Sequence, residues 1–214
     1  MRPRHELKFY INTADVHALS SKLEKVAILD QNGSYEINSL YFDNYEDKAV
    51  VEKLSGQSYR EKFRIRYYGN NTSFIRLEKK SKRDNMTYKE NAKITVTQVE
   101  DILNFKFKLP EEKLLQELYA KMRFQALRPR NIVSYKRKAY AYEPGNVRIT
   151  IDTDIRTSNF VQKFLTGFTT LPSTKYSLLE VKYDEFLPSN IYNLIQIDKR
   201  NQTEFSKYVI SRMI

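Results

Sequence analysis

Cysteine is absent from this sequence of 214 residues. Its absence excludes a disulfide framework, a thiolate metal site and a cysteine nucleophile, and it suits a cytoplasmic protein. Glycine and proline are scarce, with five and six residues, so no flexible linker stands out. The first residues lack the apolar core of a signal peptide, and no apolar run approaches the length of a transmembrane helix. We therefore expect a cytoplasmic protein with no transmembrane segment of its own.

Several motifs of nucleotide and metal sites are also missing. The sequence contains no Walker A loop, no GxGxxG and no HExxH, which disfavours a P-loop fold, a dinucleotide fold and a zincin. It has no RNP-like pattern and no Cys/His finger, so no motif indicates a nucleic-acid partner. His5 and His17 are isolated and lack the spacing of metal ligands.

Positive charge is in large excess. Lysine and arginine number 37 against 26 acidic residues, and the formal net charge is +11. This charge implies a polyanionic partner: nucleic acid, an anionic membrane surface or a phosphate-rich small molecule. The fractions of hydrophobic residues (41%) and charged residues (29%) are those of a globular protein. The length fits one domain over residues 1–214.

Charged side chains alternate with apolar ones in five stretches that have the pattern of β-strands. Residues two apart share a face of a strand, so Arg64 and Arg66 are predicted on one face and Ile65 on the other. Like charges that face each other across neighbouring strands are destabilising unless an anion lies between them. The pattern therefore predicts a sheet whose polar face binds an anion. The five stretches are residues 6–8, 64–66, 76–80, 148–152 and 180–182.

Most predicted strands are neighbours joined by tight turns, which favours an antiparallel sheet and the α+β class. Hairpins are expected across Gly69-Asn70-Asn71 and Pro144-Gly145-Asn146. Eight or so strands with few obvious edges could close into a barrel with a polar, basic lumen and helices packed outside. Strands are predicted over 6–11, 35–42, 58–68, 73–80, 89–95, 131–143, 147–154 and 177–183. Helices are predicted over 13–27, 46–54, 97–105 and 111–123, and in two pieces after Pro188.

The charged residues on these strands have the chemistry of a phosphate site with a metal. Arginine binds phosphate with two parallel hydrogen bonds, and lysine supplies a mobile point charge. Glu6, Glu78 and Glu180 each lie two residues from a lysine, and Mg²⁺ and Mn²⁺ prefer carboxylate oxygens. The alternative for each acid is an internal salt bridge to that lysine. Asp152 is the weaker candidate among the acids, because Asp-Thr-Asp at a predicted strand end is often turn chemistry.

Eight short motifs, taken in order, resemble the VTC domain, the polyphosphate polymerase family of the triphosphate tunnel metalloenzymes. The resemblance extends over nearly the whole chain, and the order of the motifs makes it specific. The motifs are ELKF (6–9), SLYFDN (39–44), RIRYY (64–68), LEKK (77–80), YKRKAY (135–140), RITID (148–152), LEVK (179–182) and FSKY (205–208).

The resemblance implies a closed antiparallel β-barrel, the triphosphate tunnel fold, whose basic lumen binds polyphosphate and triphosphate with Mn²⁺ or Mg²⁺. It implies that Glu180 holds the metal with Glu6 and Glu78 nearby, and that Lys207 comes from a C-terminal helix. The implied catalytic residues are Arg64, Arg66, Arg137 and Lys207. The implied phosphate-binding residues are Lys8, Lys80, Lys93, Arg148 and Lys182, and Lys89 is an alternative to Lys93.

The implied reaction is transfer of the terminal phosphoryl group of ATP to a growing polyphosphate chain. An inorganic triphosphatase would use the same tunnel with a water as the attacking group. A non-catalytic module that binds polyphosphate or inositol phosphates would need the basic wall without the three acids. A membrane-protein partner that accepts the product is left open, as are nucleotide preference, chain length and oligomeric state. A nucleic-acid partner is not expected, because the arginines would face the lumen.

Overall fold

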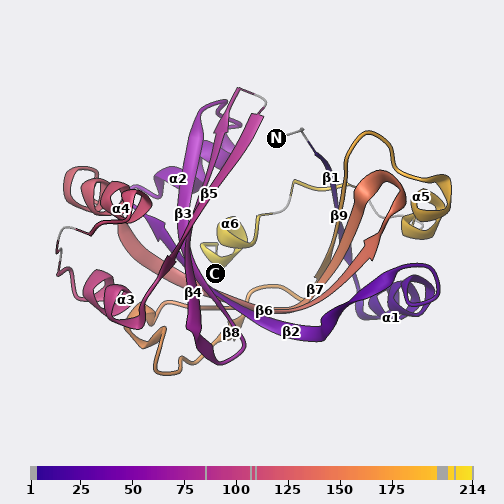
Figure 1. Cartoon of the computed structure of the whole chain (residues 1–214), viewed down its shortest axis with the longest axis horizontal. Helices are drawn as coiled ribbons and strands as arrows, with labels where there is room; N and C mark the ends of the chain where they lie inside the picture. The colour runs from indigo at the N-terminus through magenta and orange to yellow at the C-terminus, as the bar shows by residue number, and fades with distance from the viewer. Residues whose placement is uncertain are drawn as a thin grey trace. The chain divides into compact units, whose positions relative to one another are not determined.

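The computed structural model describes residues 4–84, 86–106, 108, 110–196, 202–204 and 206–213. Within these residues it contains nine strands and six α-helices (Figure 1), which confirms the α+β class. The strands are β1 (His5–Ile11), β2 (Ile28–Asp43), β3 (Arg60–Tyr68), β4 (Asn71–Arg83), β5 (Met86–Ile94), β6 (Arg128–Tyr142), β7 (Val147–Ser158), β8 (Leu171–Pro172) and β9 (Ser177–Tyr183).

The helices are mostly short. They are α1 (Thr13–Leu23), α2 (Lys48–Leu54), α3 (Val96–Leu103), α4 (Lys113–Phe124), α5 (Ser189–Ile195) and α6 (Lys207–Ser211), with 3₁₀ turns η1 (Pro144–Asn146) and η2 (Val161–Lys163). Helices α5 and α6 are the two pieces predicted after Pro188; Phe205, in the last motif, lies outside the described residues. None of the helices in the described ranges is long and apolar enough to span a membrane.

One antiparallel sheet contains all nine strands. Its order is β1-β9-β7-β6-β2-β3-β4-β5, and β8 pairs with β7. The two predicted hairpin turns connect β3 with β4 and β6 with β7, and both use glycine at positive φ: +53° at Gly69 and +76° at Gly145. The order ends at β1 and β5, and no ladder within the described part of the chain joins these two strands. Closure into a barrel therefore stays a prediction.

The chain divides into two compact units. The first unit comprises Met1–Glu36, Tyr135–Ile155 and Pro172–Lys207, and the second comprises Ile37–Ser134, Arg156–Leu171 and Tyr208–Ile214. The long strands β2 and β6 contribute residues to both units. Whether residues 1–214 act as a single domain stays a prediction.

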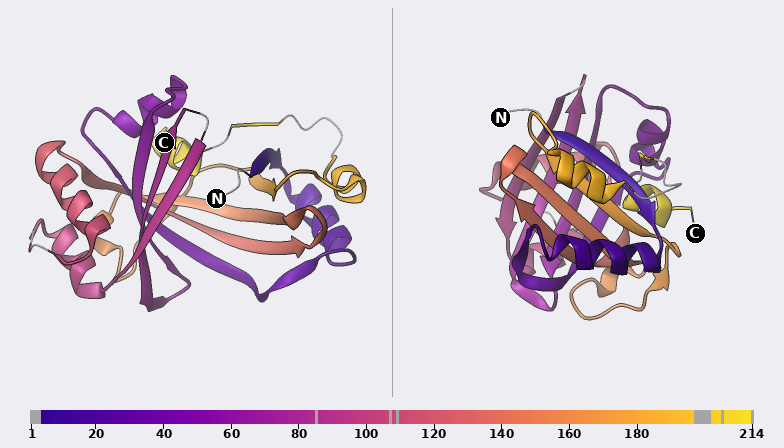
Figure 2. Two further views of the ribbon diagram at one scale, coloured as in Figure 1. Left: turned by 45° about the horizontal axis from the view of Figure 1, so that its top comes forward. Right: turned by 90° about the vertical axis from the view of Figure 1, so that its right-hand side faces the viewer.

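In the first unit, the apolar face of β1, β7 and β9 packs against α1 and α5 (Figure 2, right). Ile149 on β7 lies opposite Val181 on β9, and both are fully buried. The two helices complete this core with Leu19, Leu23, Ile191 and Ile195. The charged residues of the same strands occupy the opposite face, because successive side chains of a strand alternate.

In the second unit, α3 and α4 cover the apolar face of β3, β4 and β5 (Figure 1). Phe63, Ile65 and Tyr67 are buried in this core together with Val99 of α3 and Leu118 of α4. The predicted alternation on β3 is therefore confirmed: the odd residues lie under the helices, and Arg64 and Arg66 lie on the other face.

Several predicted boundaries differ from those of the structure. Strand β2 begins at Ile28, seven residues before the predicted 35, and α1 ends at Leu23 and not at Ala27. Helix α3 begins at Val96 and not at the predicted residue 97, and it is capped by Thr95, whose hydroxyl accepts the Gln98 N–H at 3.2 Å. Two capping patterns overlap in the sequence here: Thr95 with Gln98, and Thr97 with Glu100. Because β5 ends at Ile94, the helix begins at the earlier one.

Candidate functional site

The polar face of the first unit carries acids and cations in register on three strands. Lys8 on β1 lies opposite Glu180 on β9, which lies opposite Thr150 on β7. Side chains at such paired positions are near neighbours, so opposite charges attract directly across the strands. A second row, two residues further along the strands, consists of Glu6, Lys182 and Arg148.

The Lys182 ammonium lies between two carboxylates. Its Nζ is 2.5 Å from Oε1 of Glu180 and 3.3 Å from Oε1 of Glu6. Lys8 donates to Oε2 of Glu6 at 2.9 Å. Burial would raise the pKa of Glu180, but Lys182, Lys207 and Lys8 hold that pKa well below its usual range. The salt-bridge alternative is therefore confirmed for Glu6 with Lys8 and for Glu180 with Lys182; a metal at these acids stays a prediction.

A second cluster in the first unit centres on Asp152, which is fully buried. Its carboxylate accepts Nε and Nη2 of Arg137 at 2.6 and 2.7 Å, and the Lys207 ammonium lies 2.5 Å from Oδ2. The Tyr135 ring lies 5.3 Å from the Arg137 guanidinium and 4.7 Å from the Lys207 ammonium. Burial would raise the pKa of Asp152, and Lys207 and Arg137 lower it. The turn interpretation of Asp152 is wrong, because the residue lies inside β7 and binds two cations.

In the second unit, Glu78 on β4 is the corresponding buried acid. Arg64 contacts its Oε2 through Nε at 2.6 Å and Nη2 at 2.5 Å, and Lys89 lies 3.1 Å from Oε1. Burial would raise the pKa of Glu78, but Arg64, Arg66 and Lys89 lower it to about 2. Glu78 is thus an anion at neutral pH, and it aligns the Arg64 guanidinium.

Tyr41 on β2 lies opposite Arg64 and adds a hydroxyl to this cluster. Arg64 Nη1 donates to the Tyr41 hydroxyl at 3.3 Å, and the Tyr41 ring stacks on Tyr208 with centroids 5.0 Å apart. Burial would raise the pKa of Tyr41, yet Arg64, Lys62 and Arg66 lower it to about 7. Beside these three cations, the buried Tyr41 hydroxyl loses its proton close to neutral pH.

A row of three cations crosses the polar face of the second unit next to Arg64. Arg66 on β3 lies opposite Arg76 on β4, which lies opposite Lys93 on β5. Arg66 donates to the Ser39 hydroxyl at 3.1 Å. The Phe74 ring lies 4.6 Å from the Arg76 guanidinium and 5.8 Å from the Lys93 ammonium. Like charges at paired positions favour an anion between them.

The pair Glu6 and Glu180 fits a hard divalent cation. Mg²⁺ is commonly bound by one or two carboxylates and completes its coordination shell with water and phosphate oxygens. The described residues contain no group of three or more histidine, aspartate or glutamate side chains that could hold a metal alone. The hydroxyl of Thr150, buried in the row of Glu180, has no hydrogen-bond partner among the residues that the structure describes. A carboxylate pair with an unsatisfied hydroxyl nearby is suited to a metal that arrives with its substrate.

The predicted site residues divide between the two units. All of them lie on polar strand faces except Lys207, which begins α6. Lys93 and its alternative Lys89 share one face of β5, but Lys93 lies in the Arg66 row and Lys89 contacts Glu78. The first unit contains Glu6, Lys8, Arg137, Arg148, Glu180, Lys182 and Lys207. The second contains Arg64, Arg66, Glu78, Lys80 and Lys93. Their roles stay predictions.

Three residues of these clusters are absent from the predicted site residues: Asp152, Tyr41 and Arg76. Asp152 ends the motif RITID, and its even spacing from Arg148 places both on one strand face. Arg76 has the same spacing relative to Glu78 and Lys80. For these two, period-two alternation was the available signal. Tyr41 carries no signal of its own, because its pKa depends on Arg64, Lys62 and Arg66 from the neighbouring strand.

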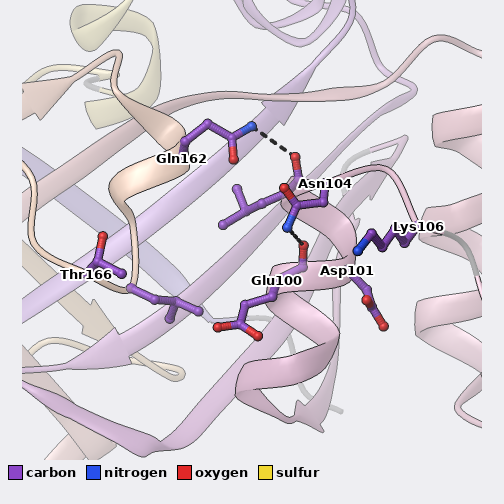
Figure 3. A pocket seen from close by; sticks show the side chains of 8 residues that line it. Glu100, Asp101, Asn104, Lys106, Gln162 and Thr166 are labelled. Carbon is purple, nitrogen blue, oxygen red and sulfur yellow. Dashed lines mark hydrogen bonds between the residues drawn. The ribbon is translucent and has the colours of Figure 1, made fainter.

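An open pocket of about 290 Å³ lies in the second unit between the end of α3 and the η2 segment (Figure 3). Gln162 donates to the Leu103 carbonyl at 2.9 Å, and Asn104 donates to the Glu100 carbonyl at 2.9 Å. The charged residues that line the pocket are Glu100, Asp101 and Lys106. None of the predicted site residues lines it, so we assign it no part in the site.

Solved structures that are similar to this chain come from several organisms. A putative adenylate cyclase from Bacillus halodurans is 12% identical with a TM-score of 0.54, and the match covers 92% of each chain. A Pyrococcus horikoshii protein is 15% identical with a TM-score of 0.47, covering 90% of this chain and 85% of that one. A putative adenylate cyclase from Vibrio parahaemolyticus is 11% identical with a TM-score of 0.45, covering 90% and 82%.

At 12% identity, the likeness to the Bacillus halodurans protein concerns the fold alone. No curated protein matches the chain. The family model of the VTC domain, in contrast, matches residues 3–214. That match spans both units and every predicted site residue. The chain therefore belongs to the VTC domain family.

Proposed function

We propose that this protein is a metal-dependent polyphosphate polymerase, which transfers the terminal phosphoryl group of ATP to the end of a polyphosphate chain and releases ADP. Family membership supports a phosphate-related function of the tunnel type. The two polar faces supply what such a reaction needs: ionised carboxylates and fixed cations. We further propose that the polar faces line the lumen of a closed tunnel, through which the growing chain leaves.

The observation that carries the proposal is the position of Lys182 between Glu180 and Glu6. Two carboxylates on neighbouring strands that share one cation would suit a hard metal that also contacts phosphate. Mn²⁺ or Mg²⁺ bound there would neutralise phosphate oxygens and help to align the transfer. Glu78, in the second unit, contacts Arg64 and Lys89. We therefore propose that its main role is to align the Arg64 guanidinium, and that any part in metal binding is secondary.

Arginine and lysine would perform most of the catalysis. The attacking group is an oxygen of the chain-end phosphate, and the bond that breaks joins the terminal phosphorus of ATP to the oxygen that leaves with ADP. Charge spreads over the transferred group in the transition state, and preorganised cations stabilise it without rearranging. Arg64 and Arg137 are each aligned by a buried carboxylate, Glu78 and Asp152. No protein nucleophile is required.

A single incubation tests the proposal. The protein is mixed with ATP and Mn²⁺, and the products are resolved for ADP, long polyphosphate, free orthophosphate and cyclic AMP. We expect long polyphosphate and ADP, with little orthophosphate. Orthophosphate without polyphosphate would instead establish a hydrolase, and cyclic AMP would establish the activity named for the Bacillus halodurans protein. No turnover together with tight triphosphate binding would establish a binding module.

The hydrolase is the second candidate, because it uses the same residues with a water as the attacking group. The paired acids favour either enzyme over a sensor. A phosphate sensor needs no metal, so the pair Glu6 and Glu180 would not help it, since carboxylates repel the anion that it binds.

A further inference from the structure

Three polar side chains share one face at the end of β2, within the motif SLYFDN. Ser39, Tyr41 and Asp43 alternate with apolar residues that are buried in the core under α3 and α4. The Ser39 hydroxyl accepts a hydrogen bond from Arg66, and the Tyr41 hydroxyl accepts one from Arg64. The third residue, Asp43, is also buried, and it bonds to α6 instead.

The Asp43 carboxylate is held at both of its oxygens. Oδ1 accepts the backbone N–H groups of Asn44 and Ala49, each at 2.9 Å, and Ala49 lies in the first turn of α2. Oδ2 accepts the Tyr208 hydroxyl at 2.7 Å. A buried polar network whose members all have partners is rigid. Asp43 therefore fixes the position of the Tyr208 hydroxyl on α6.

The Tyr208 ring contacts Tyr41, which in turn contacts Arg64. The two rings stack with their centroids 5.0 Å apart and their planes at 25°. Both rings are buried, but neither belongs to the apolar core under α3 and α4. Burial and Asp43 raise the pKa of Tyr208, so its hydroxyl keeps the proton that it donates. We name Asp43, Tyr208 and Tyr41 the aromatic bridge.

The aromatic bridge ends where the hold of Glu78 on Arg64 is incomplete. Nε and Nη2 of Arg64 both contact the same oxygen of Glu78, Oε2, at 2.6 and 2.5 Å. Two contacts that meet at one oxygen leave the guanidinium able to pivot about it, unlike a fork that uses two oxygens. Tyr41 accepts the third nitrogen, Nη1, at 3.3 Å and so supplies a second fixed point.

We propose that Asp43 and Tyr208 are positioning residues, which fix the Arg64 guanidinium through the stacked Tyr41 ring. This inference rests on the proposed function for the role of Arg64 in phosphoryl transfer. The competing role for the two residues is to attach α6 to the sheet. That role has another provider, because Arg212 donates to both carboxylate oxygens of Asp47, at 3.0 and 3.1 Å.

Tyr208→Phe tests the aromatic bridge, because it keeps the stacked ring and removes the hydroxyl that Asp43 holds. Tyr67→Phe is the matched control in the same unit. Tyr67 is buried, its ring packs on Phe164 with centroids 5.0 Å apart, and its hydroxyl donates to the Phe164 carbonyl at 2.9 Å. It lies on the other face of β3 from Arg64.

Three measurements are made on the parent and on both variants. They are kcat and KM for ATP with Mn²⁺ from ADP formation, the unfolding free energy from denaturant titration, and the pH titration of phenolate absorbance. The signal of Tyr41 in that titration is the one that Tyr41→Phe lacks.

Both variants should lose similar stability, since each loses one buried hydrogen bond. Tyr208→Phe alone should lower kcat about threefold to tenfold, with KM for ATP unchanged. It should also move the Tyr41 titration to higher pH, because a looser Tyr41 lies less firmly against the cations of β3. An equal fall of kcat in the control, or a Tyr41 titration that stays in place, would overturn the aromatic bridge. A higher KM at unchanged kcat would make Tyr208 a substrate contact and overturn it as well.

Asp43→Asn tests the other end of the aromatic bridge. An amide has one acceptor oxygen in place of two, so it cannot serve both Tyr208 and the N–H groups of α2. If Asp43 acts through Tyr208, the double variant Asp43→Asn/Tyr208→Phe should lower kcat no further than Asp43→Asn does. Losses that multiply would show two independent effects and overturn the inference. Tyr208→Phe carries the test alone if Asp43→Asn does not fold.

The aromatic bridge and the polymerase can fail separately. A protein that releases orthophosphate and makes no polyphosphate refutes the polymerase, and the same kcat comparison then applies to hydrolysis. A protein without turnover still reports the contact between Tyr41 and Arg64 in its phenolate titration. A polymerase in which Tyr208→Phe and Tyr67→Phe have the same kcat refutes the aromatic bridge alone.

Discussion

Asp152 holds Arg137 with both of its carboxylate oxygens, through Nε at 2.6 Å and Nη2 at 2.7 Å. The pair joins β6 to β7 on the polar face, and Lys207 contacts the same carboxylate at 2.5 Å. Because Asp152 is fully buried, its charge is available only to these cations. One buried acid therefore aligns two of the residues to which we assign catalysis.

Asp152→Asn should destabilise the fold and misplace both cations. Removing one partner of a buried ion pair leaves charge without compensation, and the expected loss is about 3 kcal/mol of unfolding free energy. Denaturant titration measures it. The control is Asp154→Asn, since Asp154 is an exposed partner of Lys136 at 3.7 Å and should contribute under about 1 kcal/mol. Equal effects of the two variants would show that Asp152 is not a buried structural acid.

Glu180→Gln should remove most turnover and leave phosphate binding largely intact. The amide keeps the size of the side chain but lacks the charge that a hard cation needs. The measurements are turnover in limiting Mn²⁺ and the affinity for triphosphate. Glu143→Gln, at an exposed position, serves as the control. Normal turnover in limiting Mn²⁺ would mean that Glu180 only forms a structural salt bridge with Lys182.

Arg64→Ala and Arg137→Ala distinguish an enzyme from a binding module. Each removes a charge-assisted contact worth about 1.5–3 kcal/mol, or about one to two decades in an equilibrium constant. If the contacts act on the transferred group, the rate of ADP formation should fall more than the affinity for a non-hydrolysable ATP analogue. Arg83→Ala is the control for loss of a surface arginine. Weaker binding by a parent that never forms ADP would leave only the binding module.

Tyr41→Phe should remove a titration near pH 7. The folded pKa of about 7 lies below the usual value of 10, so the phenolate stabilises the folded state. This contribution is complete above pH 10 and is lost as the pH falls through about 7. The unfolding free energies of parent and variant should therefore diverge between pH 7 and 10, and phenolate absorbance should report the transition. Tyr45→Phe, at an exposed position, should leave unchanged both the pH dependence of the unfolding free energy between pH 7 and 10 and the absorbance transition near pH 7.

Alternation with a period of two was the most reliable signal in the sequence. It placed Arg64 and Arg66 opposite the buried Phe63, Ile65 and Tyr67, because the pleat of a strand leaves no other arrangement. It failed at the start of β2, where residues 28–34 lack a clear alternation. The turns at Gly69 and Gly145 were predictable, since both require positive φ, which glycine adopts at little cost.

Pairing between strands was not accessible in the same way. The like-charge rows of Arg66, Arg76 and Lys93 depend on the registers of β3 with β4 and of β4 with β5. A slip by one residue would place these cations under the helices. The same registers decide that Lys89, and not Lys93, reaches Glu78.

By itself, the sequence determined the α+β class, the polar and apolar faces of most strands, and the family, because these depend on residue type and spacing along one chain. The tertiary structure decided which charges meet. It gave Asp152 two cations and Lys182 two carboxylates, and it placed Tyr41 beside Arg64. The physical reason is that electrostatic energy depends on distance and burial, and both are set by segments far apart in the chain.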